Sequence, residues 1–228
     1  MSDQERMTQF EKALLGLRSA IMGGEFSASA RLSEVALAKR LGISRTPLRQ
    51  AMDRLVAEGL LERLEAGGCR VASFTREDIY DAIELRGVIE GTAVRFAAER
   101  GADPELMSRA KWILDEIDLA QSDPADVDFE AYVRLNAEFH EILAELSGSD
   151  VIRREIDRVC RLPLASPSAF LQDQELVPDF FASLLRAQDQ HRAILEAVAA
   201  RQGTRAEALA REHAQLARRN LDFLSEAD

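Results

Sequence analysis

Three histidines are the residues of this chain whose type and spacing best fit metal chemistry. His140, His191 and His213 are the only histidines among the 228 residues. Asn136 precedes His140 by four residues, so on a helix both side chains lie on one face. His191 lies 12 residues before Gly203 and His213 lies 10 after it, which gives them similar heights on two antiparallel helices. We therefore predict that three imidazoles and an amide oxygen converge inside a helical bundle.

Such a ligand set suits a divalent metal, with Zn²⁺ first and Ni²⁺, Mn²⁺ or Fe²⁺ also compatible by ligand type. Taken singly, each histidine is better explained as a satisfied core or surface residue, and only their joint placement favours a site. A metallohydrolase is the alternative, with Glu138 or Glu141 as the base. These carboxylates do not share the helix face of Asn136, and no nucleophile motif accompanies them. We therefore expect that the chain is not an enzyme.

A second group of residues suits nucleic-acid chemistry at the start of a helix. Ser44, Arg45, Thr46 and Arg49 surround a helix N-terminus, whose free N–H groups and positive dipole end favour a phosphate. Arg45 and Arg49 are four residues apart on one face, so both could enter a DNA major groove and bind guanine bidentately. The alternative is that both arginines solvate a surface helix and pair with Asp53.

The elements around this helix favour DNA reading. An apolar stripe predicts a first helix over residues 8–23, and capping signals predict helices over 34–41 and 45–58, separated by a short turn at Gly42. Two β-prone runs, 60–63 and 69–74, are joined by Ala66-Gly67-Gly68 and predict a hairpin. Helix, helix, short turn, helix and hairpin is the order of a winged helix-turn-helix, which we assign to residues 1–74.

Helical patterns alone fill the remainder of the chain. A helix capped by Thr75 runs to about residue 100, and five more are predicted near 103–122, 124–147, 150–161, 178–201 and 204–224. Residues 163–174 are loop-like. We therefore predict a mainly α protein, in which residues 75–228 form an all-α antiparallel helical bundle.

Charge is divided unequally between these two regions. The whole chain carries a net charge of −11, yet residues 1–74 hold 11 Lys and Arg against 9 Asp and Glu, a net of +2. The remaining 154 residues carry −13. A mildly basic head on an acidic body is expected when only one module contacts phosphate.

Local sequence features indicate the cellular compartment and the state of the two cysteines. No apolar run approaches the roughly 18 residues of a membrane span, and Met1 to Arg6 is polar, so we expect a cytoplasmic protein without a membrane partner. Cys69 and Cys160 are far apart and are expected to be free thiols. We expect Cys160 in the core and Cys69 in an exposed turn. A redox switch at Cys69 is the disfavoured alternative.

The run from Leu32-Ser33-Glu34 through Leu41-Gly42-Ile43-Ser44-Arg45-Thr46-Pro47-Leu48-Arg49 to Gly59-Leu60 resembles the GntR family of bacterial transcription regulators. That resemblance implies a dimer whose second helix and wing read two DNA half-sites, with Arg45, Thr46 and Arg49 at contacting positions. Many members carry arginine where this chain has Val35. The wing tip also lacks the basic residue that many members carry between its glycines. The charge of Arg70, near Gly68, would replace it.

The second region resembles the FCD effector domain of the FadR-type subfamily. The resemblance rests on Asp81 to Arg86 with Glu90, the pair Asn136 and His140, and the runs Gln190 to Leu195 and Glu212-His213. It implies a divalent metal held by an aspartate and three histidines, and Asn136 replaces that aspartate, which should weaken metal binding. It also implies a carboxylate effector. Arg86 matches a pocket arginine, with an ion pair to Glu90 or Glu84 as its alternative, and Asn220 is a weaker effector candidate.

More narrowly, Asp81 to Gly91 and Arg219-Asn220 resemble the vanillate-responsive branch, which implies an aromatic acid; sugar acids and short organic acids stay open. The chain is thus expected to be a homodimeric repressor that binds a pseudo-palindromic double-stranded DNA operator. A small carboxylate would shift the bundle and, through the helix starting at Thr75, the recognition helices. A DNA-binding protein without metal is a further alternative.

Overall fold

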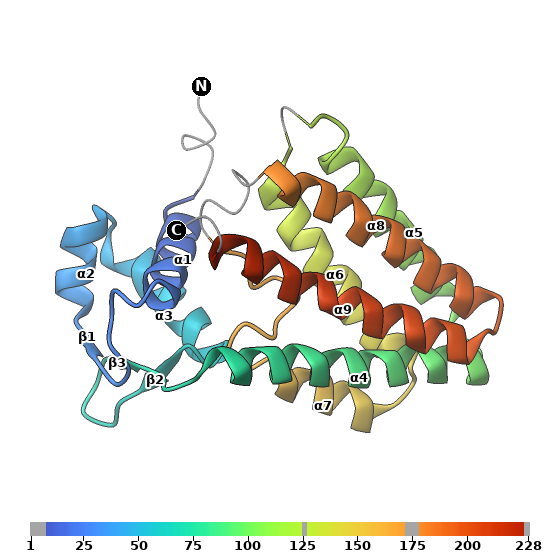
Figure 1. Cartoon of the computed structure of the whole chain (residues 1–228), viewed down its shortest axis with the longest axis horizontal. Helices are drawn as coiled ribbons and strands as arrows, with labels where there is room; N and C mark the ends of the chain where they lie inside the picture. The colour runs from blue at the N-terminus through green and yellow to red at the C-terminus, as the bar shows by residue number, and fades with distance from the viewer. Residues whose placement is uncertain (1–7, 125–126, 172–177, 226–228) are drawn as a thin grey trace.

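The computed structural model describes residues 8–124, 127–171 and 178–225. Within these ranges the chain is mainly helical, with a small three-stranded sheet near the N-terminus (Figure 1). In chain order the elements are α1 (Gln9–Met22), β1 (Arg31–Leu32), α2 (Glu34–Leu41), α3 (Arg45–Ala57), β2 (Leu61–Arg63), β3 (Cys69–Val71), α4 (Arg76–Arg100), α5 (Pro104–Ala120), α6 (Phe129–Leu146), α7 (Asp150–Val159), α8 (Pro178–Ala199) and α9 (Gly203–Ser225).

The elements α1 to β3 form the winged helix-turn-helix that the sequence predicts. Thr8 and Glu11 form a reciprocal capping box that starts α1. Gly42 ends α2 in the left-handed conformation, at φ 66°, and this sets the tight turn into α3. Ser44 is the N-cap residue of α3, although its side chain makes no capping hydrogen bond with the described residues.

The sheet departs from the prediction in two ways. Its order is β1-β3-β2 with antiparallel pairing, and β1 was not predicted because two residues are too few to show an alternating pattern. The hairpin strands are also shorter than predicted. The exposed position expected for Cys69 is wrong, because β3 begins at this residue and its side chain turns into the core at 3% exposure.

Burial of Cys69 bears on the redox alternative. Burial raises the pKa of the Cys69 thiol, so little reactive thiolate forms at neutral pH. Cys160 is half-buried just after α7, and burial raises the pKa of its thiol to about 12. Both thiols are free, as expected. Burial of the Cys69 thiol therefore argues against a redox switch at this position.

Six helices, α4 to α9, form the predicted bundle, and α4 lies along α9 over most of its length (Figure 1). Thr75 and Asp78 form the capping box that starts α4. Gly87 allows the close approach of the two helices, since a Cβ there would lie 2.8 Å from Cβ of Ala214. A larger side chain at position 87 would therefore push α4 and α9 apart.

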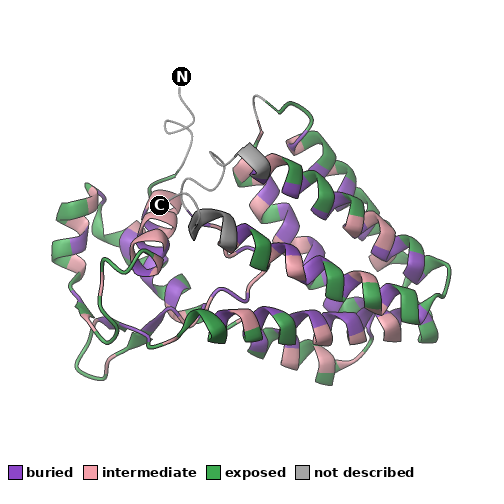
Figure 2. Ribbon diagram, viewed as in Figure 1, coloured by how far each residue is buried: buried purple, intermediate pink, exposed green. Residues whose placement is uncertain are grey.

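Beside a small cluster of Ala93, Ala144 and Ile156, two large apolar cores hold the described residues together. One fills the bundle between α5, α6, α8 and α9, where buried positions face inward along each helix (Figure 2). The other lies under the winged helix, and it includes Ile79 and Ile83 of α4 with Leu164 and Leu171 of the segment after α7. The second core therefore joins the N-terminal region to the bundle.

Some sequence expectations fall outside the described residues. Residues 163–171 run between α7 and α8 without a regular element, as predicted, whereas residues 172–174 of that predicted loop are not described. The N-terminal stretch Met1 to Arg6 is likewise outside the described ranges. Among the described helices, none is both long and apolar enough to span a membrane.

Candidate metal centre and DNA-reading surface

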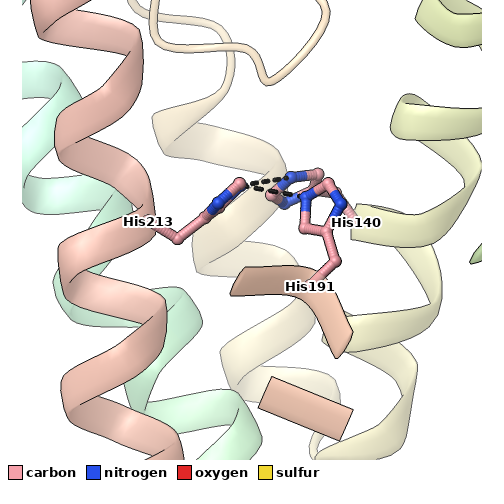
Figure 3. A group of neighbouring side chains, drawn as sticks. All are labelled: His140, His191 and His213. Carbon is pink, nitrogen blue, oxygen red and sulfur yellow. Dashed lines mark hydrogen bonds between the residues drawn. The ribbon is translucent and has the colours of Figure 1, made fainter. Parts of the chain in front are cut away.

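The three histidines converge at the centre of the bundle (Figure 3). His140 comes from α6, His191 from α8 and His213 from α9, and all three are buried. Nε2 of His213 lies 3.1 Å from Nε2 of His191 and 3.3 Å from Nε2 of His140. One potential ligand atom from each residue lies within 4.8 Å of the others. The helical spacing that predicts this cluster is thus reproduced in three dimensions.

Glu90 of α4 orients one of these rings. Its Oε1 lies 2.8 Å from Nδ1 of His140, and both side chains are buried. Burial opposes ionisation of Glu90, but the charges of His140 and Arg86 outweigh it and lower the pKa of Glu90 to about 2. An ionised carboxylate on Nδ1 holds the proton on that nitrogen and leaves Nε2 of His140 as the ligand atom.

Glutamine oxygens orient the other two rings. Oε1 of Gln188 lies 3.3 Å from Nδ1 of His191, and Oε1 of Gln190 lies 3.3 Å from Nδ1 of His213. The amide nitrogen of Gln188 donates to Asp118 at 2.8 Å and to a backbone carbonyl, which fixes the oxygen toward the ring. Each Nδ1 atom therefore faces an oxygen acceptor, and the three Nε2 atoms face one another.

Three converging lone pairs fit a divalent cation. Metal–nitrogen distances of about 2.0–2.1 Å place tetrahedral ligands about 3.3 Å apart, close to the two Nε2 separations. Burial also keeps His191 and His213 neutral, because it lowers the pKa of His191 well below its ordinary value and that of His213 to about 3. The donor set thus fits zinc or a similar ion.

Asn136 completes the predicted ligand set on the same face of α6. Its side chain is buried, and its Nδ2 donates a hydrogen bond to the backbone oxygen of Pro167 at 3.0 Å. This contact occupies the amide nitrogen and leaves Oδ1 as the atom that could bind a metal. The amide would contribute no negative charge, so a bound ion would keep its full positive charge for an incoming anion.

A small pocket, partly open to solvent, lies beside two of the histidines, His140 and His213. Its polar lining residues come from four helices: Arg86, Tyr132, Asn136, His140, Ser183, His213 and Asn220. The carbonyl side of Asn220 accepts a hydrogen bond from Ser183 at 2.7 Å. Predicted metal ligands and both predicted effector residues therefore border one space.

Arg86 is the unusual group in this cavity. It is only 2% exposed, and its Nε and Nη1 have no hydrogen-bond partner among the described residues. Oε2 of Glu90 lies 3.6 Å from Nε, which is an ion pair but too long for a hydrogen bond. The other predicted partner, Glu84, instead pairs with Arg211 on the surface. A buried guanidinium with unused donors can bind an anion at this position.

The predicted DNA-contacting residues lie together on the exposed face of the winged helix. Ser44, Arg45, Thr46 and Arg49 of the α3 N-terminus are exposed, while Leu48 and Met52 face the core, and Leu55 is buried with them. At the wing tip, Gly68 adopts φ 81° in the turn, and the side chain of Arg70 is exposed on β3.

The arginines of this surface pair with acidic side chains, but none of these is Asp53, the partner that the sequence predicts for Arg45 and Arg49. Glu34, the first residue of α2, contacts both Arg45 and Arg49. Asp53 instead pairs with Arg63, and Arg70 pairs with Glu62 at 2.6 Å. The contact of Glu34 with these arginines spans two helices and has no helical spacing, so it leaves no signal in the sequence.

The segment of residues 163–171, called here the bridging segment, connects the cavity with α3. The carbonyl oxygen of Pro167 accepts the bond from Asn136, and Oγ of the next residue, Ser168, accepts one from Arg54 of α3 at 3.2 Å. The backbone oxygen of Phe170 accepts from Arg18 of α1. One short stretch of backbone therefore contacts the metal-ligand helix and both large helices of the winged domain.

A buried ion pair fixes the same junction. Arg18 donates to both carboxylate oxygens of Glu58, just after α3, at 2.8 and 2.9 Å. Nε of Arg54 donates to Glu58 at 2.8 Å as well. The side chains of Arg18 and Glu58 are 1% and 3% exposed. The end of the recognition helix is thus tied to α1 and to the bridging segment.

Comparison with known proteins adds independent observations. Residues 81–216 match the FCD domain, and residues 11–71 match the bacterial regulatory proteins of the gntR family. The chain belongs to the GntR family of transcriptional regulators and carries an FCD domain. This explains why histidine-bearing helices follow a winged helix-turn-helix, and it shows that the chain is a DNA-binding transcription regulator of this family.

Individual relatives agree with that assignment. The Nta operon transcriptional regulator of Aminobacter aminovorans is 32% identical over 58% of this chain and 60% of its own length. The transcriptional repressor GlaR of Escherichia coli is 28% identical over 86% of this chain and 88% of its own length. These relatives are regulators rather than enzymes, which sets the metallohydrolase alternative aside.

Solved structures show the same fold. The Escherichia coli protein McbR/YncC superposes with a TM-score of 0.61 and 19% identity, covering 97% of this chain and all of the other. At that identity the likeness concerns the fold alone. The winged helix and the FCD bundle are thus arranged as in a known protein of this architecture.

Proposed function

We propose that this regulator represses transcription and is controlled by a small carboxylate that binds at a metal centre in the FCD domain. The observation that carries the proposal is Arg86, a buried guanidinium with unused donors beside three converging Nε2 atoms. A divalent metal at the histidines and Asn136 would supply a Lewis-acidic position for one carboxylate oxygen. Arg86 would bind the same group from the other side of the cavity.

The lining of the cavity supports an aromatic or short organic acid as the effector class. Tyr132 and Phe170 line it together with Leu184, so a flat apolar group could pack there. Asn220 and Ser183, which also line the cavity, offer polar contacts. We keep the aromatic acid as the preferred class, in line with the resemblance to the vanillate-responsive branch.

On the DNA side we propose that residues 1–74 bind an operator as part of a homodimer. Arg45, Thr46 and Arg49 would reach base edges in the major groove, and the free N–H groups near Ser44 would bind phosphate. The wing would contribute Gly68 and Arg70. Two copies would read pseudo-palindromic half-sites about one helical turn apart.

Residues 75–228 would then form the effector and dimerisation unit, with two contacts to the DNA-binding unit. One is the continuous helix α4, which begins at Thr75 and carries both Arg86 and Glu90. The other is the bridging segment, in which the adjacent residues Pro167 and Ser168 contact Asn136 and Arg54, respectively. A ligand that moved Asn136 or Pro167 would displace the support of the recognition helix.

A panel of carboxylic acids tests this function. The melting temperature of the zinc-loaded protein would be measured with each acid. Its affinity for an operator fragment selected from random DNA would be measured in parallel. We expect at least one acid to raise the melting temperature and to change DNA affinity, with both effects lost in Arg86→Met. An acid that acts equally on the Arg86→Met protein would contradict the proposed anion site.

Metal content distinguishes this proposal from the alternative of a DNA-binding protein without metal. Protein purified without chelator or nickel resin should contain close to one equivalent of zinc or another divalent metal, and a His213→Ala variant should lose it. Equal metal content in the two proteins would mean that the histidine cluster is not the binding site.

A further inference from the structure

The carboxylate of Glu34 lies on the DNA-reading surface, where a negative charge would be expected to repel phosphate. Its Oε2 is 2.9 Å from Nη2 of Arg49, and its Oε1 is 3.3 Å from Nε of the same guanidinium. The same Oε2 lies 3.8 Å from Nη2 of Arg45. One acid thus holds two of the arginines that face DNA.

The local structure explains why this acid stays ionised and in place. Glu34 is the first residue of α2, where Ser33 caps the helix and the positive dipole end favours a carboxylate. Its side chain is 23% exposed, whereas those of Arg45 and Arg49 are 64% and 58% exposed. The acid is therefore the better anchored partner, and the arginines extend from it toward solvent.

The geometry of the pair leaves the DNA-binding edge of Arg49 available. A carboxylate bound through Nε and Nη2 uses one side of the guanidinium. The remaining edge, formed by Nη1 and the second N–H of Nη2, still presents two parallel donors that match O6 and N7 of guanine. The contact with Glu34 is thus compatible with simultaneous base reading.

We propose that Glu34 is a specificity-determining residue, which supports Arg49 for guanine recognition and suppresses binding of both arginines to the phosphate backbone. The support reduces the conformational entropy that Arg49 loses when it binds a base. The negative charge cancels part of the attraction to phosphate, which every DNA sequence offers equally. This inference rests on the proposed DNA-reading role of Arg49.

Glu34→Gln tests the inference, because it keeps the shape of the side chain and removes its charge. Affinity would be measured for a duplex selected by the wild-type protein and for a shuffled duplex of the same length and composition. We expect the ratio of the two affinities to fall about fivefold, mainly through tighter binding to the shuffled duplex. The slope of log affinity against log salt for the shuffled duplex should steepen by about one.

Two further variants separate the possible causes. Glu25→Gln removes the same charge from the exposed pair with Arg40 on the same domain, and it should leave the affinity ratio unchanged. Arg49→Ala tests the underlying DNA-reading role and should abolish the preference for one guanine position. Substituting each base pair of the selected duplex in turn should show that Glu34→Gln relaxes the preference at that same position.

The outcomes are distinguishable. If Arg49→Ala leaves base preference intact, the DNA-reading role proposed for Arg49 is wrong. If Arg49→Ala relaxes the preference while Glu34→Gln behaves like Glu25→Gln, only the role of Glu34 is overturned. Melting curves of all variants report whether the folded domain is retained, and we expect that it is because neither acid is fully buried.

Discussion

Replacing Glu58 by glutamine should destabilise the whole protein, because it removes one partner of a fully buried ion pair. Arg18 makes hydrogen bonds to both oxygens of Glu58 at 2.8 and 2.9 Å, and both side chains are at most 3% exposed. Removing one member of such a pair leaves the other charge buried without compensation and costs about 3–5 kcal/mol. For a chain of this size, about 2–4 °C per kcal/mol gives a fall in melting temperature of roughly 6–20 °C.

The assay is thermal unfolding followed by circular dichroism, with urea unfolding as a check on the free energy. Glu25→Gln is the matched control, since its pair with Arg40 is about half exposed and should contribute less than about 1 kcal/mol. The double variant Arg18→Met with Glu58→Leu should lose less stability than the sum of the single changes, since no unpaired charge stays buried. A Glu58→Gln protein that melts within about 2 °C of wild type would refute the reasoning.

Other expectations concern the metal centre and the helix contact that positions it. Glu90→Gln should weaken zinc binding about 10- to 100-fold in a competition titration, because it removes the carboxylate that orients His140, and unchanged affinity would contradict that role. Without metal, the free energy of unfolding should fall as pH drops from about 6.5 toward 3. In this range the unfolded chain binds a proton at His213, whereas the folded chain does not bind it until the pH reaches the lowered pKa of His213, about 3. His213→Gln should flatten that part of the pH profile, and an unaltered slope would assign it to other groups. Gly87→Val should reduce stability by more than about 1 kcal/mol in urea unfolding, since even a Cβ would lie 2.8 Å from Ala214; a neutral effect would mean that α4 and α9 separate freely.

Local signals in the sequence predict the elements that carry the site. The limits of α2 follow from the cap at Ser33 and the left-handed glycine at position 42, and the structure has the same helix limits. The convergence of His191 and His213 follows from their similar distances to the break at Gly203, because antiparallel neighbours of equal length align such positions. These are short-range regularities, and they are visible without a structure.

Contacts between distant segments could not be predicted in the same way. Glu90 and His140 are 50 residues apart, and only the packing of α4 against α6 brings them together. The contact of Glu34 with Arg49 depends on the angle between α2 and α3. The exposure predicted for Cys69 was wrong. This residue follows the turn directly and begins β3, and whether a residue belongs to the turn or to the strand decides whether its side chain faces solvent or the core.

The bridging segment shows the same limit on a larger scale. Its prolines and serines predict a loop, and the sequence gives no sign that Pro167 contacts α6 of the bundle while Ser168 contacts α3 of the winged helix. Backbone carbonyls carry two of its three contacts, with Asn136 and with Arg18. Because any residue supplies a carbonyl, side-chain types at these positions do not indicate the connection.

The most direct test of the central claim is the operator dissociation constant of the zinc-loaded protein, measured across a panel of aromatic and short carboxylic acids for wild type and Arg86→Met. We predict that at least one acid changes the wild-type dissociation constant fivefold or more, a typical coupling free energy of about 1 kcal/mol, and leaves that of Arg86→Met unchanged. Dissociation constants that do not respond to any acid, or that shift equally in both proteins, would contradict control by a carboxylate at this centre.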